Sequence, residues 1–77
     1  MNEMDVYATI GSRLKFLREE KGLTTTALAE TLDCTENAYK KYEAGKKRID
    51  VDRIKLAAKF YDVTVDFVVG ITQLRRF

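Results

Sequence analysis

A stripe of polar side chains near the middle of the chain has the chemistry needed to hydrogen-bond the edges of nucleic-acid bases. The members of the stripe are Glu36, Asn37, Lys40, Lys41 and, completing it, Ala44. Their spacing puts them on one face of a helix, opposite a face that carries Tyr39 and Tyr42. In the major groove of a duplex an amide can pair with adenine, an ammonium with guanine, and a carboxylate with the cytosine amine.

A short basic run follows this stripe. Residues 40 to 48 contain five basic residues and one acidic residue, a net charge of +4, whereas residues 1 to 30 contain four basic and five acidic residues, a net charge of −1. This separation of charge indicates a surface directed at a polyanion. We therefore expect Lys46, Lys47 and Arg48 to contact phosphates, the alternative being a solvated basic loop.

Few residues of the chain are suited to catalysis or to binding a metal. The 77 residues include no histidine and one cysteine, Cys34. This leaves no imidazole base, Ser-His triad, internal disulfide or multi-thiolate zinc site. No paired catalytic carboxylates and no glycine-rich phosphate loop can be identified either. We expect no enzyme, and no site for a metal, a cofactor or a small-molecule ligand.

The start of the chain and its hydropathy predict a cytoplasmic protein without membrane contact. The opening "MNEMDVYATIG" is acidic where a secretory signal would be basic. No apolar run approaches the roughly 18 to 20 residues that cross a bilayer.

Five helices are expected to position the polar stripe, because the apolar residues recur at helical spacing and the chain has no proline. Residues that can cap a helix precede four of the five, namely Thr24, Thr35, Asp50 and Thr64, and Gly22 can end the first. The side chains expected to face the core are Tyr7, Ile10, Leu14, Leu17, Leu28, Ala29, Leu32, Tyr39, Tyr42, Val51, Ile54, Ala57, Ala58, Tyr61, Val65, Phe67 and Val68.

The connection between the second and third helices is very short. Only Asp33, Cys34 and Thr35 separate them, so the two helices must cross instead of lying antiparallel. This is helix-turn-helix geometry. The sequence therefore predicts one compact all-α domain over residues 1–77.

Four fragments occur in an order and spacing typical of a known family: "IGSRLKFLREEKGLT", "ALAETL", "KYEAGKK" and "VTVDFVVG". Over residues 10–70 the chain thus resembles the Cro/repressor-type (XRE, lambda-repressor-like) helix-turn-helix DNA-binding family. The resemblance implies a five-helix lambda-repressor-like fold whose third helix is the recognition helix, followed here by a short tail at 71–77. It also implies a homodimer on a palindromic operator, with half-sites one duplex turn apart.

The resemblance also implies residue roles. It places base contacts at Glu36, Asn37 and Lys41, with Lys40 nearby. It places phosphate contacts at Thr25, Thr26, Lys46 and Lys47. It pairs Arg18 with Glu43 as a buried ion pair, which would remove Glu43 from the DNA-contacting set. The chain departs from the family in having Thr25 where a glutamine is usual, and Asp33 where a glycine usually adopts a left-handed conformation.

Some apolar residues fit no core-facing stripe, among them Phe16, Leu56 and Phe60. One interpretation is that the tail folds back and covers Leu56 and Phe60. The other is contact with a second copy, for which the candidate residues are Leu56, Phe60, Val69, Ile71 and Phe77.

The expected function is that of a bacterial or phage transcriptional regulator, a repressor that binds double-stranded DNA as a homodimer and lies on the nucleoid when bound. Two alternatives stay open: an antitoxin or restriction-modification controller on the same fold, and a protein-interaction adaptor that has lost DNA affinity. The basic run counts against the adaptor, while Glu36 and Thr25 favour it slightly.

Overall fold

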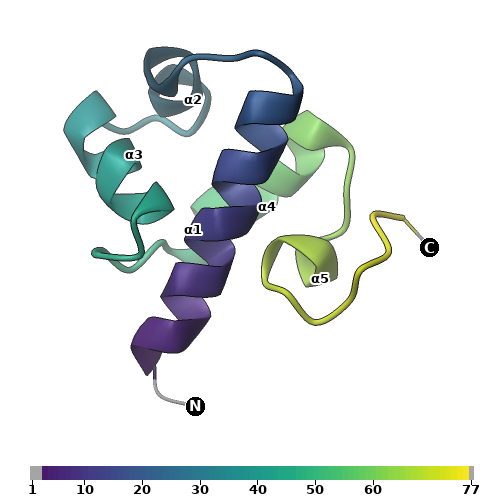
Figure 1. Ribbon diagram of the computed structural model, residues 1–77. Coiled ribbons are helices and arrows are strands. Elements are labelled where there is room, and N and C mark those ends of the chain that lie inside the picture. Colours follow the sequence, from purple (N-terminus) through teal and green to yellow (C-terminus); the bar gives the residue numbers. More distant parts are fainter. Residues whose placement is uncertain (1–2, 77) are drawn as a thin grey trace.

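The computed structural model describes residues 3–76, with side chains from residue 5 onward. Its helices are α1 (Glu3–Glu20), α2 (Thr25–Thr31), α3 (Glu36–Glu43), α4 (Val51–Tyr61) and α5 (Val65–Val68), and the described residues form no strand. In Figure 1, α1 crosses the front of the molecule, with α2 and α3 to one side and α4 and α5 to the other. The predicted all-α, five-helix fold is confirmed.

Helices α2 to α5 begin where capping residues satisfy their free backbone N–H groups. The side chains of Thr24, Thr35, Asp50 and Thr64 each accept a hydrogen bond from the backbone N–H three residues further on. All four predicted caps are confirmed.

Each of the five helices is followed by a residue with left-handed backbone angles. This conformation lets the backbone N–H groups at the helix end donate hydrogen bonds to carbonyls of the last turn. After α1, Gly22 has φ +66°, and its N–H bonds to Glu19 O at 3.1 Å. After α2, Asp33 has φ +55°, so the left-handed turn expected at this residue is confirmed. This tight ending makes the crossing of α2 and α3 possible.

The core contains nearly all the apolar residues expected there. Val51 and Val65 are the exceptions, with exposed fractions of 66% and 38%, so their predicted burial is wrong. Each is the first residue of its helix, and the residue before the cap takes the core position instead: Ile49 before α4, and Val63 before α5. These residues lie where a hydrophobic staple would place them, and the helix start therefore faces solvent.

Helix α1 lies directly against the C-terminal half of α3. A Cβ atom added at Gly11 would be 2.4 Å from the carbonyl oxygen of Glu43 and 2.5 Å from that of Tyr42. One added at Gly45 would be 2.8 Å from Ala8 Cα. Only glycine permits these approaches, so α3 is fixed against the longest helix.

The turn between α2 and α3 is tied to α4 by Arg53. Its Nε donates to Leu32 O at 2.9 Å and its Nη2 donates to Asp33 O at 2.7 Å. Its Nη1 pairs with Asp50 at 2.8 Å. One guanidinium thus satisfies two carbonyls at the end of α2 and bonds to the cap of α4.

The tail folds back, but not over α4. The Arg75 carbonyl accepts from Thr64 N–H at 2.7 Å, and its guanidinium makes two hydrogen bonds with Glu20, at 2.7 and 2.8 Å. Leu56 and Phe60 stay 43% and 47% exposed. The interpretation that the tail covers them is therefore wrong.

The tail lies beside Phe16 and Phe67 instead. The Arg75 guanidinium is 5.2 Å from the ring centre of Phe16 and 5.6 Å from that of Phe67. Cation–π attraction and the ion pair with Glu20 both favour this side of the molecule.

Candidate nucleic-acid interface

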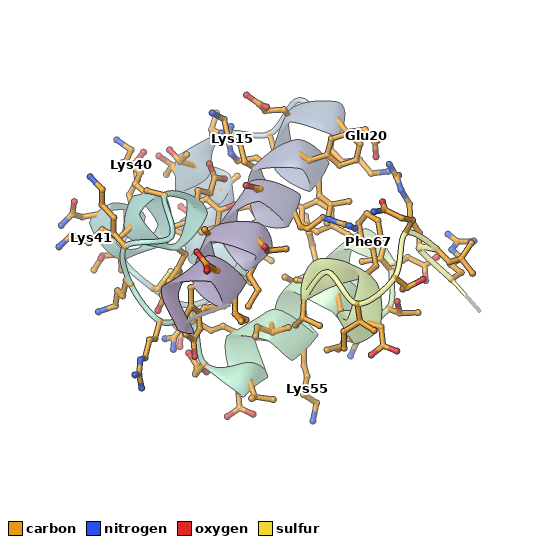
Figure 2. All side chains as sticks on the ribbon, turned by 60° about the horizontal axis from the view of Figure 1, so that its bottom comes forward. Lys15, Glu20, Lys40, Lys41, Lys55 and Phe67 are labelled. Carbon is orange, nitrogen blue, oxygen red and sulfur yellow. The ribbon has the colours of Figure 1, made fainter. Side chains whose placement is uncertain are left out.

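Helix α3 presents its polar stripe to solvent. All members of the stripe, Ala44 included, are exposed, whereas Tyr39 and Tyr42 on the opposite face are buried. In Figure 2, Lys40 and Lys41 project away from the body of the molecule. The outward placement expected from helical spacing is confirmed, while contact of the stripe with DNA stays a prediction.

The first residue of α2 contacts the first residue of α3. Thr25 Oγ1 donates to Glu36 Oε2 at 2.7 Å, and Lys40 Nζ lies 3.7 Å from the same oxygen. Hydrogen bonding from Thr25 is the largest cause that lowers the pKa of Glu36, and the charge of Lys40 adds to it, so Glu36 stays ionised. Because the threonine hydroxyl has one proton, Thr25 cannot donate to Glu36 and to a phosphate at once. As the molecule stands, Thr25 positions Glu36.

The other residues expected to contact phosphate lie at the two ends of the helix-turn-helix unit. Thr26 is exposed at the start of α2. Lys46, Lys47 and Arg48 are exposed in the loop after α3, directly beyond Gly45. The close approach of Gly45 to Ala8 fixes where this basic run begins.

Arg18 and Glu43 join α1 to the last residue of α3. Arg18 Nε lies 2.7 Å from Glu43 Oε2, and Nη2 donates to Oε1 at 3.1 Å. A third donor, Nη1, bonds to Leu23 O at 3.0 Å. The two side chains are only 15% and 9% exposed. Hydrogen bonding to the carboxylate raises the pKa of Arg18 further above its usual value, and the charge of Glu43 is directed into the protein.

Two residues that position α3 were missed by sequence reasoning. Gly11 stands inside an otherwise regular helix, and such a glycine is a signal of close approach that could have been used. Arg53 gave no such signal, because its role depends on where the end of α2 comes to lie.

The residues expected at a dimer contact are partly in place. Leu56 and Phe60 lie one turn apart on the outer face of α4, and Ile71 is 76% exposed. Val69 is half-buried and packs against the core. Phe77 lies outside the described residues.

Neither a membrane-spanning helix nor a metal-binding cluster occurs in the described part of the chain. No helix there is long and apolar enough to cross a membrane. No group of three or more His, Cys, Asp or Glu side chains is placed to hold a metal ion within the same residues.

Sequence comparison relates this chain to bacterial regulators. Residues 14–68 match the model of the family described as Helix-turn-helix. The HTH-type transcriptional regulator YobD of Bacillus subtilis is 38% identical over 60 residues, which cover 78% of this chain and 54% of YobD. Regulator RC0668 of Rickettsia conorii is 40% identical over 58 residues, 75% of this chain and 46% of that protein. The chain thus spans about half the length of the curated relatives it matches.

Two solved structures share the fold. The clp gene regulator ClgR from Corynebacterium glutamicum superposes with a TM-score of 0.78 at 22% identity, over 84% of this chain and 69% of ClgR. The restriction-modification controller protein C.AhdI from Aeromonas hydrophila gives a TM-score of 0.73 at 24% identity, over 80% of this chain and 94% of C.AhdI.

Proposed function

The chain belongs to the helix-turn-helix family, of the Cro/repressor (XRE) type, and we propose that it is a transcriptional regulator that binds double-stranded DNA through α3. The observation that carries this proposal is the exposed polar stripe of α3, which is followed directly by the exposed basic run. Such a pairing supplies base-edge donors and phosphate contacts on one surface.

In the proposed complex α3 lies in the major groove. Asn37, Lys40 and Lys41 then contact bases, with Glu36 accepting from a cytosine amine. Thr26, Lys46, Lys47 and Arg48 contact phosphates and fix the docking.

Three features hold α3 in the position that such docking requires. They are the Arg18–Glu43 pair, the contact of Gly11 with the end of α3, and the hydrogen bonds from Arg53 to the turn before α3. A recognition helix held this firmly loses little freedom on binding.

The regulator is proposed to act as a homodimeric repressor in the cytoplasm, on the nucleoid when bound, where it blocks RNA polymerase at a palindromic operator. Exposed apolar side chains on α4 and in the tail support contact with a second copy through Leu56, Phe60 and Ile71. Sedimentation at high protein concentration without DNA tests this step. We expect the unchanged protein to sediment as a dimer and Phe60→Ser to dissociate it. If the unchanged protein sedimented as a monomer, no dimer would form before DNA is bound.

A restriction-modification controller is the second candidate, since C.AhdI is matched over 94% of its length. At 24% identity this likeness shows the fold alone. A methyltransferase or nuclease gene next to the coding sequence would favour this candidate. Neither candidate is an enzyme.

Two substitutions separate the proposed base contacts from the phosphate contacts. Lys41→Ala should relax the preference at one base pair and weaken binding to the preferred duplex by about 1–3 kcal/mol. Lys47→Ala should weaken binding to all duplexes alike and reduce the salt slope by about 0.9. Titrations of both variants with different duplexes, over a range of salt concentrations, measure these changes in affinity. If the two variants lost affinity identically across sequences, the division of roles would be refuted.

A further inference from the structure

Lys15 on α1 is an exposed cation that the proposed function leaves without a role. It shares one edge of the helix with Gly11 and Arg18, at spacings of four and three residues. Both of those neighbours contact α3: Gly11 meets the Glu43 carbonyl, and Arg18 binds the Glu43 carboxylate. Lys15 therefore projects from the edge of α1 that lies against α3.

The matching edge of α3 carries Glu36, Lys40 and Glu43 at the same kind of spacing. Ala8 meets Gly45 beyond the end of α3, whereas Arg18, ten residues later, reaches back to the Glu43 side chain. Lys15 lies between Gly11 and Arg18 on α1, and both of these contact Glu43, so Lys15 lies beside the last turn of α3. In Figure 2, Lys15, Lys40 and Lys41 follow one side of the outline, and Lys55 lies on another.

The charge of Lys15 is available to a ligand. Its side chain is exposed, and no ion pair joins it to any residue between 5 and 76. By contrast Lys40 has Glu36 at 3.7 Å. Glu19, one turn further along α1, is exposed too, but it is not paired with Lys15.

We propose that Lys15 donates to a DNA phosphate beside the recognition helix. The inference rests on the proposed function, because it takes α3 to be in the major groove. Lys46, Lys47 and Arg48 would then hold the backbone beyond the end of α3, and Lys15 would hold it along the side that faces α1. Such a contact adds affinity without sequence preference.

The test compares Lys15→Gln with Lys55→Gln on a duplex enriched from a random library by the unchanged protein. Each variant loses one exposed lysine, so their net charges are equal. Lys15→Gln should lower affinity several-fold, reduce the salt slope by about 0.9 and leave base preference unchanged. Hydroxyl-radical footprinting should show lost protection at the edge of the half-site. Lys55→Gln should change none of these, and Lys15→Arg should restore binding.

The possible outcomes separate this inference from the proposed function. Unchanged protein that shows no salt-dependent DNA binding refutes both. Unchanged protein that binds, with Lys15→Gln and Lys55→Gln indistinguishable in slope and footprint, refutes the role of Lys15 alone. Equal melting temperatures of the two variants establish that both are folded.

Discussion

The hydroxyl of Thr25 donates a hydrogen bond of 2.7 Å to the carboxylate of Glu36, and so joins the first residue of α2 to the first residue of α3. An anion facing DNA repels phosphates unless it is directed at a donor on a base. The cytosine amine is such a donor in the major groove. Thr25 holds the Glu36 carboxylate in one place, which is what a specific contact of this kind requires.

Replacing Thr25 with valine removes the hydroxyl and keeps the shape of the side chain. We expect Thr25→Val to weaken discrimination at the base pair that Glu36 contacts by about 1 kcal/mol, with the salt slope unchanged. Competition between duplexes that differ at single base pairs measures this, and Glu36→Gln should move the preference at the same pair toward adenine. Equal weakening of all duplexes by Thr25→Val would mean that the hydroxyl serves a phosphate instead.

The Arg18–Glu43 pair should carry much of the stability of the unit. Arg18→Ala leaves the largely buried carboxylate of Glu43 without its partner and should cost about 3 kcal/mol. Arg76→Ala is the matched control, because the pair of Arg76 with Asp62 is 71% and 77% exposed, and such pairs contribute under about 1 kcal/mol. Chemical denaturation of both variants decides the matter, and equal losses would show that the Arg18 pair is no stronger than a surface pair.

Gly11 should tolerate no side chain. Gly11→Ala places Cβ 2.4 Å from a backbone oxygen, so α1 must move away from α3. We expect lower stability together with weaker DNA binding, even though alanine favours a helix by about 1 kcal/mol over glycine.

Gly22→Ala is the control for this variant. An added Cβ there meets nothing within 4 Å, and only the left-handed backbone, with φ +66°, is strained. It should lower the melting temperature and leave DNA affinity intact below the transition. A Gly11→Ala protein with normal affinity would show that α3 need not be held against α1.

The stability of the protein should fall in acid. Hydrogen bonding to Arg75 lowers the pKa of Glu20, and hydrogen bonding to Arg53 lowers that of Asp50, from ordinary values of 4.5 and 3.8. Because the unfolded chain then binds more protons, this stabilisation is complete above the unfolded pKa values and is lost as the pH falls through the folded ones. With no histidine in the chain, the melting temperature should be flat near neutrality and drop below about pH 5.

Asp50→Asn tests the origin of this drop. Asparagine can still cap α4 but has no charge to pair with Arg53. The variant should melt at a lower temperature than the unchanged protein at pH 7, and its melting temperature should fall less on acidification. If the melting temperatures of the two proteins fell by the same amount on acidification, a contribution from Asp50 would be excluded.

Local features of the fold could be predicted from the sequence because each depends on a few adjacent residues. Thr24, Thr35, Asp50 and Thr64 have side chains that cap helices, and each does so. The core-facing tyrosines Tyr39 and Tyr42 followed from helical spacing, which also placed the polar stripe of α3 outward.

What could not be predicted depends on how segments meet. Val51 matched the spacing of the α4 core face, but that face begins one turn later, at Ile54, because Ile49 fills the space. The tail was expected, in one interpretation, to cover Leu56 and Phe60, but the pair of Arg75 with Glu20 holds it on another side of the molecule, and this depends on where α1 ends. For Thr25, the family resemblance implied a phosphate contact, but nothing in the sequence indicated that Glu36 would accept its proton.

Selection of bound duplexes from a random DNA library at physiological salt, read by sequencing, tests the central claim most directly. We predict an enriched two-fold motif with half-sites about one helical turn apart, which Lys41→Ala would alter at one base pair of each half-site. If no sequence were enriched and no DNA were retained in a salt-dependent manner, the exposed stripe of α3 would be a solvated surface and the proposed function would be wrong.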